Sequence, residues 1–217
     1  DDGRCEIEHD GILALARNLP NSEVRCDLAT TLEHNTGELE LVKEYRHQQL
    51  GDVFEVPMRH RFDTAVIGRL VSLFKERDIH IVHTHGYKSD IIGMLAARRA
   101  GIRCVTTPHG FENARDLKLR LFIWLGCKAM TRADRVVPLS QQLMDDARQA
   151  GVSETRLRYV QNGVDLSEVE EERKRPVPAK SKKRIGFIGQ LISRKNIEHI
   201  LDTFTALHRE RGDIELM

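Results

Sequence analysis

The chain has few cysteines, and those it has are scattered. None of the four forms a C-x-x-C pair, so a disulfide-bonded secreted fold is not indicated. Cys26 and Cys104 lie inside strand-like runs, where a buried free thiol is the ordinary interpretation. Buried free thiols are typical of a reducing compartment. The other two are Cys5 and Cys127.

Long apolar runs and a charge excess of one sign are missing too. No run approaches the roughly 18 apolar residues of a spanning helix, and no signal-peptide pattern is present. With 34 Lys and Arg against 33 Asp and Glu, the net charge is +1. Such a balance creates no global field that would favour nucleic acid as a partner. We therefore expect a cytoplasmic, globular protein whose 217 residues form one large or two small domains.

What the chain does have is an alternation of two hydrophobic periods. Short runs rich in Val and Ile predict strands at 23–30, 79–84, 102–107, 135–140, 157–161, 184–189 and 214–217. Between them, apolar residues at helical spacing predict helices at 64–78, 89–101, 141–151 and 196–211. The helix at 89–101 is expected to start at a Ser or Asp cap and to stop at Gly101. Such an alternation indicates an α/β fold with a parallel sheet covered on both faces.

A charged segment interrupts this pattern. Residues 167–184 carry Pro176 and Pro178 and little apolar content, as an interdomain connection does. We expect a first domain at 1–167, a linker at 168–183 and a second domain that starts at 184–217. One βαβ unit cannot close a core, so the second domain is expected to be truncated. The first 19 residues predict a loop and helix with no first strand before them, which suggests a fragment of a longer protein.

Two strand ends carry the same dipeptide. His85-Gly86 follows one predicted strand, and His109-Gly110 follows the next. Neighbouring parallel strands end at the same edge of a sheet, where open α/β sheets bind ligands. Glycine allows a sharp turn and close approach, and imidazole donates or accepts hydrogen bonds near neutrality. These residues predict a site for a polar or anionic ligand beside helix N-termini.

Two plainer interpretations compete with this site. A single histidine at a strand end is more often a hydrogen-bonded loop residue than a ligand-binding group. His83 and His85, two residues apart, could also share one face and bind a metal. We favour a metal-free site, because no third ligand or acidic cluster is evident.

Five motifs in order resemble glycosyltransferase family 4, whose retaining enzymes have the GT-B fold. They are "IVHTHG", "TPHG", "ADRVVPLS", "VQNGVD" and "IGFIGQLISRKNIEHILDTF", and "GRCEIE" is similar to the family's Gly-Gly-x-Glu loop. The resemblance implies two Rossmann-like domains facing across a cleft, the acceptor on the first and the nucleotide sugar on the second. Asn162, in the fourth motif, would then lie beside the cleft rather than in a β-hairpin turn.

The family's donor motif, Gly-Arg-Leu-x-x-x-Lys-Gly, is only partly matched. Gly189 and Lys195 fit, but Gln190 replaces the arginine and Asn196 the final glycine. Arg194 could supply the missing charge. Two adjacent cations at a helix start oppose the helix dipole unless an anion sits there, which favours a bound phosphate.

The resemblance implies transfer of a hexose from a nucleotide diphosphate sugar to a glycan or lipid-linked acceptor, with retention and without metal. His85 would hydrogen-bond the donor sugar near the reacting carbon, and Lys195 would stabilise the departing diphosphate. The family's later glutamate pair would lie beyond Met217, so we expect this chain alone to be inactive. A UDP-sugar 2-epimerase and a non-catalytic nucleotide-sugar-binding module are the alternatives. Cell-envelope or exopolysaccharide synthesis is the commonest setting of such relatives.

Residues 111–135 mix apolar side chains with an excess of Lys and Arg. A basic amphipathic helix with Trp124 can lie on an anionic membrane, in keeping with a protein peripheral to the inner membrane face. The alternative is a helix that covers the sheet with its apolar residues and leaves a basic side in water. We favour this second interpretation, because a sheet-packing helix needs the same apolar residues.

Overall fold

The computed structural model describes residues 4–19, 23–33, 39–60, 62–109, 117–161, 163, 166–175, 183–189 and 195–217. The chain divides into a first unit, Arg4–Val164, and a second unit that contains Asp165–Met217. Every strand pair within the described residues is parallel, which confirms the α/β prediction.

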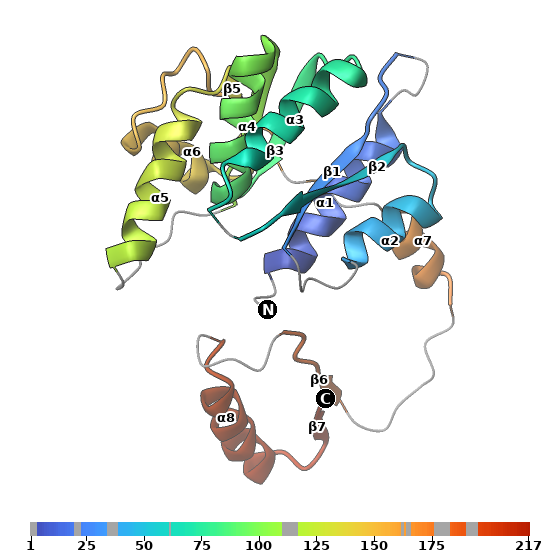
Figure 1. Cartoon of the computed structure of the whole chain (residues 1–217). Helices are drawn as coiled ribbons and strands as arrows, with labels where there is room; N and C mark the ends of the chain where they lie inside the picture. The colour runs from blue at the N-terminus through green and yellow to red at the C-terminus, as the bar shows by residue number, and fades with distance from the viewer. Residues whose placement is uncertain are drawn as a thin grey trace. The chain divides into compact units, whose positions relative to one another are not determined.

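The first unit alternates helices and strands along its whole length (Figure 1). Its sheet is in two parts, β1-β2 and β3-β4-β5. The elements are α1 (Arg4–Asn18), β1 (Leu28–Glu33), α2 (Glu40–His47), β2 (Val53–Met58), α3 (Ala65–Glu76), β3 (Ile81–His85), α4 (Tyr87–Ala100), β4 (Arg103–Thr107), α5 (Leu117–Met130), β5 (Arg135–Val136) and α6 (Gln141–Gln149).

The strand β2 was not predicted from the sequence, because Pro57 lies inside it. Proline has no backbone N–H to donate and is confined to edge strands, to strand starts and to bulges. In the structure Pro57 pairs with Leu32 of β1, and β2 is an edge of its two-stranded sheet.

Several other strands are shorter than predicted. β1 starts at Leu28 rather than Glu23, β5 ends at Val136 rather than at residue 140, and β6 ends at Ile185 rather than at Gly189. The predicted strand 157–161 is a single bridge between Leu157 and Val136.

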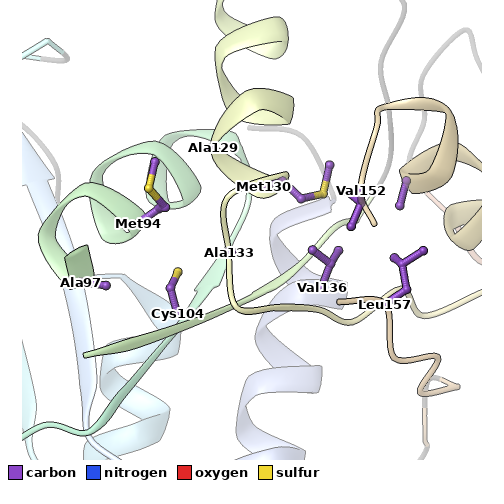
Figure 2. Packing of buried hydrophobic residues seen from close by; sticks show 10 residues of the cluster. Met94, Ala97, Cys104, Ala129, Met130, Ala133, Val136, Val152 and Leu157 are labelled. Carbon is purple, nitrogen blue, oxygen red and sulfur yellow. The ribbon is translucent and has the colours of Figure 1, made fainter. Parts of the chain in front are cut away.

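The largest buried cluster joins three helices and two strands (Figure 2). Its members come from α4, β4, α5, β5, α6 and the segment that follows α6, and they are Met94, Ala97, Cys104, Ala129, Met130, Ala133, Val136, Ala147, Val152 and Leu157. A second cluster packs the predicted apolar face of α3 against β2 and α4. Between them the two clusters hold α4 firmly on β3 and β4, because α4 contributes to both.

The helix starts agree with the sequence at one position and differ at another. Ser140 caps α6, because its Oγ accepts a hydrogen bond from the Leu143 N–H. The prediction that Ser89 or Asp90 caps the helix at 89–101 is wrong. α4 begins two residues earlier, at Tyr87 after Gly86, and no side chain caps it. The Ser89 hydroxyl instead donates back to the Gly86 carbonyl oxygen at 2.9 Å.

The second unit contains α7 (Ser167–Arg173), β6 (Lys183–Ile185), α8 (Ile197–Glu210) and β7 (Ile214–Leu216). β6 and β7 pair in parallel on either side of α8, as the sequence predicts. α7 lies in the segment that the sequence predicts as a connection. No residue of α8 is buried, and Leu201 is half exposed. Within the described part of the whole chain, no helix is both long and apolar enough to cross a membrane.

Candidate functional site

His85 and His109 meet at the carboxyl edge of the β3-β4 pair. The two strands are parallel, and His85 at the end of β3 lies opposite Thr107 at the end of β4. His85 Nδ1 is 3.0 Å from His109 Nε2, and the ring centroids are 5.3 Å apart. A hydrogen bond between two ring nitrogens needs one N–H, so one ring donates and the other accepts. Each ring thereby fixes the tautomer of the other.

A third ring extends this pair along β3. The centroid of His83 is 4.4 Å from that of His85, because residues two apart on a strand share one face. The His83 Nε2 is 2.7 Å from the hydroxyl oxygen of Thr107, which is buried. Among the described residues, no group of three His, Cys, Asp or Glu side chains is arranged to hold a metal ion.

The environment keeps His85 neutral. Burial is the main cause that lowers its pKa from 6.5 to about 3, and the nearby His83 and His109 rings lower it further. The pKa of His83 is lowered too, first by burial and then by His109, although part of the residue is exposed. A neutral imidazole can donate at one nitrogen and accept at the other. Near neutral pH the His85 ring is therefore a hydrogen-bonding group and carries no charge.

Gly86 shapes the turn from β3 into α4. Its φ of 88° lies in a region that residues with a Cβ rarely adopt, while a Cβ there would meet no atom within 4 Å. The glycine is thus needed for its backbone conformation rather than for space. It also brings the uncapped first turn of α4 directly after His85. The backbone N–H groups at a helix start, together with the helix dipole, favour an anion.

A buried network below the histidines ties α4 to both strands. Asp90 Oδ1 accepts hydrogen bonds from Thr84 Oγ1 of β3 at 2.6 Å and from Thr106 Oγ1 of β4 at 2.5 Å. All three residues are buried. Gly93 lets α4 approach closely, since a Cβ there would be 2.4 Å from Thr84 Cγ2. Sequence reasoning missed this role of Asp90, and the threonines one residue before the end of each strand were the available signal.

An ion pair was also missed. Lys88 Nζ in the first turn of α4 is 3.0 Å from Glu33 Oε1 at the end of β1. Both side chains are partly exposed, so the pair contributes little to stability. It does place a cation one turn from His85, beside the uncapped start of α4.

The other predicted site residues belong to the second unit or lie outside the described residues. Lys195 is exposed and stands two residues before α8, after Gly189, which is also exposed. The intervening Asn196 has a φ of 51° and makes no side-chain cap, so α8 also begins without one. Gly110, Asn162, Gln190 and Arg194 fall outside the described residues. The structure thus brings together three of the predicted residues: His85, Gly86 and His109.

Comparisons with known proteins agree with this architecture. Residues 11–168 match Glycosyltransferase Family 4. The chain is 34% identical over 102 residues to the UDP-Gal:alpha-D-GlcNAc-diphosphoundecaprenol alpha-1,3-galactosyltransferase of Escherichia coli, covering 45% of the chain and 26% of that relative. It is 24% identical over 161 residues to an alpha-maltose-1-phosphate synthase of Mycolicibacterium smegmatis, covering 63% and 39%. The chain thus spans well under half the length of these relatives.

The fold has solved counterparts. A structure of Anabaena HepE in complex with UDP superimposes with a TM-score of 0.66 at 12% identity, covering 95% of this chain and 65% of that chain. At so low an identity the superposition shows a common fold. It agrees with the prediction of a GT-B type α/β architecture.

Proposed function

This chain belongs to glycosyltransferase family 4, and from that premise we propose that it serves a retaining transfer of a hexose from a nucleotide diphosphate sugar to a glycan or lipid-linked acceptor. The first unit would form the acceptor-side domain, 1–167, and residues 184–217 would begin the nucleotide-sugar-binding domain after a linker at 168–183. The chain alone would not turn over. The reaction would take place in the cytoplasm.

The observation that carries this proposal is the hydrogen bond between His85 and His109 at the carboxyl edge of β3 and β4. It supports a role for His85 as an oriented, uncharged partner of a sugar hydroxyl. One nitrogen of His85 is occupied by His109, which leaves the other for the ligand. A charged imidazolium would not suit an electron-poor sugar carbon, and the lowered pKa of His85 avoids it.

The remaining roles follow from charge and backbone geometry. Gly86 and Gly110 would allow the sugar to approach the backbone, and Asn162 would line the cleft. Gly189, Arg194 and Lys195 would hold the diphosphate at the uncapped start of α8. As the bond between the anomeric carbon and the diphosphate breaks, Lys195 would stabilise the negative charge that develops. The new bond forms to an acceptor oxygen, whose proton passes to the departing phosphate.

The relatives support the substrate class. The name of the Escherichia coli relative includes a UDP-linked galactose and a diphosphoundecaprenol-linked acceptor. That name supports a UDP-sugar as the first donor to try and a polyprenyl-linked glycan as the first acceptor. No metal is required by the proposed chemistry, because Lys195 and Arg194 supply the positive charge.

The test is made on the full-length protein, with nucleoside diphosphate release from UDP- and GDP-sugars measured in the presence of EDTA. We expect His85→Ala to lower kcat/KM by at least about a hundredfold, the loss typical of a group that stabilises the transition state. His80→Ala is the matched control, because His80 is exposed and lies just before the other end of β3. Lys195→Gln should raise KM for the nucleotide sugar and lower kcat, whereas Lys75→Gln, at an exposed position of α3, should do neither.

Three outcomes would contradict the proposal. Turnover that His85→Ala leaves intact would remove the histidine pair from the chemistry. Activity that EDTA abolishes would show a metal-dependent reaction. Nucleotide-sugar binding with no release of diphosphate under any acceptor would instead support a binding module.

A further inference from the structure

A side-chain hydrogen bond crosses from β3 to β4 beside the histidine pair. His83 lies opposite Val105 in the register of the two strands, and Thr107 stands two residues farther along β4. The contact between the His83 ring and the Thr107 hydroxyl is therefore diagonal, a separation that aromatic and long side chains can span. Residues two apart on a strand share a face, so the bond lies on the face of the sheet that carries His85.

This hydrogen bond restrains the His83 ring. His83 is exposed in part, so packing alone does not fix its orientation, whereas Thr107 is 3% exposed and is held in the sheet. The outer side-chain torsion of a histidine is broad, and a hydrogen bond at one ring nitrogen selects one orientation. A hydrogen bond between neutral groups shifts such an equilibrium by about two- to tenfold. Thr107 therefore anchors His83.

The anchored ring in turn restricts His85. The centroids of the His83 and His85 rings are 4.4 Å apart and their planes are tilted by 38°, so His83 blocks rotation of the His85 ring on that side. The hydrogen bond with His109 restrains His85 at Nδ1. A bond at one atom leaves a ring free to turn about the line of that bond, and a neighbouring ring removes this freedom. The two contacts together determine the plane of His85 and the direction of its second nitrogen, Nε2.

We propose that His83 is a positioning residue whose ring, anchored on Thr107, holds the plane of His85 so that Nε2 is directed at the ligand. The role rests on the sugar transfer proposed above, in which the free nitrogen of His85 bonds the donor sugar. A group that is already oriented lowers the barrier, because less ordering entropy is lost in the reacting step, and small misplacements are costly. His83 acts through His85 and needs no contact with the substrate.

The first measurement detects the position of His85 without any turnover. In the isotope-labelled chain, an N–H···N hydrogen bond between two imidazoles transmits an NMR scalar coupling between its nitrogens, and the coupling vanishes as they move apart. Thr107→Val removes the hydroxyl without changing the shape of the side chain, and it should lower the coupling between His85 and His109 by about half. His83→Ala should lower it at least as much. Thr107→Ser retains a hydroxyl and should retain the coupling.

Thr106→Val is the matched control. Thr106 precedes Thr107 on β4, and its hydroxyl donates to Asp90 on the other face of the sheet. The substitution removes a buried hydroxyl of the same kind, so it should destabilise the fold, as measured by urea unfolding, and yet leave the coupling unchanged. This control separates a loss of stability from a loss of orientation. His85→Gln identifies the coupled signal, because it deletes the pair.

The second measurement is turnover of the full-length protein with a nucleotide sugar. Thr107→Val and His83→Ala should each lower kcat about tenfold and leave KM within about twofold, because the orientation of His85 matters in the transition state. The loss should be smaller than that of His85→Ala, which removes the contacting ring itself. Thr107→Ser should retain most of kcat, and Thr106→Val should leave it unchanged.

Three results would overturn the proposal. The first is an undiminished coupling in both Thr107→Val and His83→Ala, and the second is an equal loss of coupling in Thr106→Val. The third is a lost coupling in an enzyme whose kcat is unchanged, because the orientation of His85 would then have no part in transfer. If the full-length protein releases no diphosphate from any nucleotide sugar, the function proposed above fails, whereas the coupling still supports or refutes the hold of His83 on His85.

Discussion

The chain contains the same motif twice, and the two copies differ in what surrounds them. β3-α4-β4 and β6-α8-β7 are both parallel strand–helix–strand units. Both helices begin after a residue with positive φ and without a side-chain cap, Gly86 in one and Asn196 in the other. In both motifs the sequence predicts a ligand-binding loop between the first strand and the helix. The two motifs therefore share parallel strand pairing and an uncapped helix start, although ψ is 156° at Gly86 and 46° at Asn196.

The helices of the two motifs differ in burial. α4 has five buried residues, including Asp90 and Gly93, while α8 has none. Neighbouring elements make the difference, because α3 and α5 flank α4 and contribute to the clusters around it. The comparison teaches that a strand–helix–strand motif can form from its own sequence, whereas its stability depends on the helices and strands packed around it.

Removing the buried carboxylate of α4 should have the largest effect. Asp90→Ala removes the acceptor of the buried Thr106 hydroxyl and leaves the Thr84 hydroxyl only the Val105 carbonyl oxygen, 3.4 Å away, which costs about 3 kcal/mol of unfolding free energy. The equivalent change on the open helix, Asp202→Ala, should stay within about 0.5 kcal/mol. Urea unfolding followed by circular dichroism measures both. Equal losses in the two helices would contradict the difference in burial.

A methyl group on the packed face of α4 should have the next largest effect. Gly93→Ala places a Cβ against the Thr84 methyl group, and the overpacking should cost about 2 kcal/mol. Gly68→Ala is the matched control, because a Cβ at this exposed position inside α3 meets nothing within 4 Å. It should stabilise the protein by about 0.5 to 1 kcal/mol through helix propensity. Thermal unfolding of the two variants should therefore shift in opposite directions.

Local features of the fold could be predicted from the sequence. The hydrophobic periods and glycine stops are local, and they sufficed for the parallel strand–helix–strand units. The meeting of His85 and His109 was also predictable, because neighbouring parallel strands share an edge. The Gly86 turn and its positive φ follow from the same reasoning.

The features that the sequence did not predict depend on contacts between residues far apart in the chain. Pro57 hid the strand β2, since a proline is acceptable there only because β2 is an edge. Aspartate is a common helix cap, so the sequence favoured that role for Asp90. Only the threonines on the two strands make it a buried hydrogen-bond acceptor. Trp124 looked like a core residue, because periodicity identifies an apolar face without saying whether anything covers it.

Acid should destabilise the histidine edge of the first unit. Because the folded-state pKa of His85 lies near 3, below the ordinary 6.5, the unfolded chain binds a proton on this ring between those values and the folded chain does not. Stability is therefore full above about pH 6.5 and falls as the pH is lowered toward 3, by at most about 1.4 kcal/mol per pH unit for one ring. His85→Gln should remove part of this slope.

The unfolding free energy of the parent and of His85→Gln is measured with urea at about pH 7 and about pH 5, a range in which it should fall with pH. In His85→Gln the difference between the two unfolding free energies should be smaller than in the parent by about 1 kcal/mol or more. The control His80→Gln should retain the parent's difference, because His80 is exposed. A His85→Gln slope equal to that of the parent would show that the ring takes up a proton in the folded protein.

The smallest effect is expected where α8 lacks cover. Leu201→Ala should change the unfolding free energy by no more than about 0.5 kcal/mol, because half of this side chain is already in water.

Hydrogen exchange should show the weak packing of α8 without any substitution. Amides of α8 (Ile197–Glu210) should exchange well before those of α4 (Tyr87–Ala100), since helices with few buried contacts open locally at low cost. Protection of α8 equal to that of α4 would mean that the second motif is as firmly packed as the first, and the contrast between them would be lost.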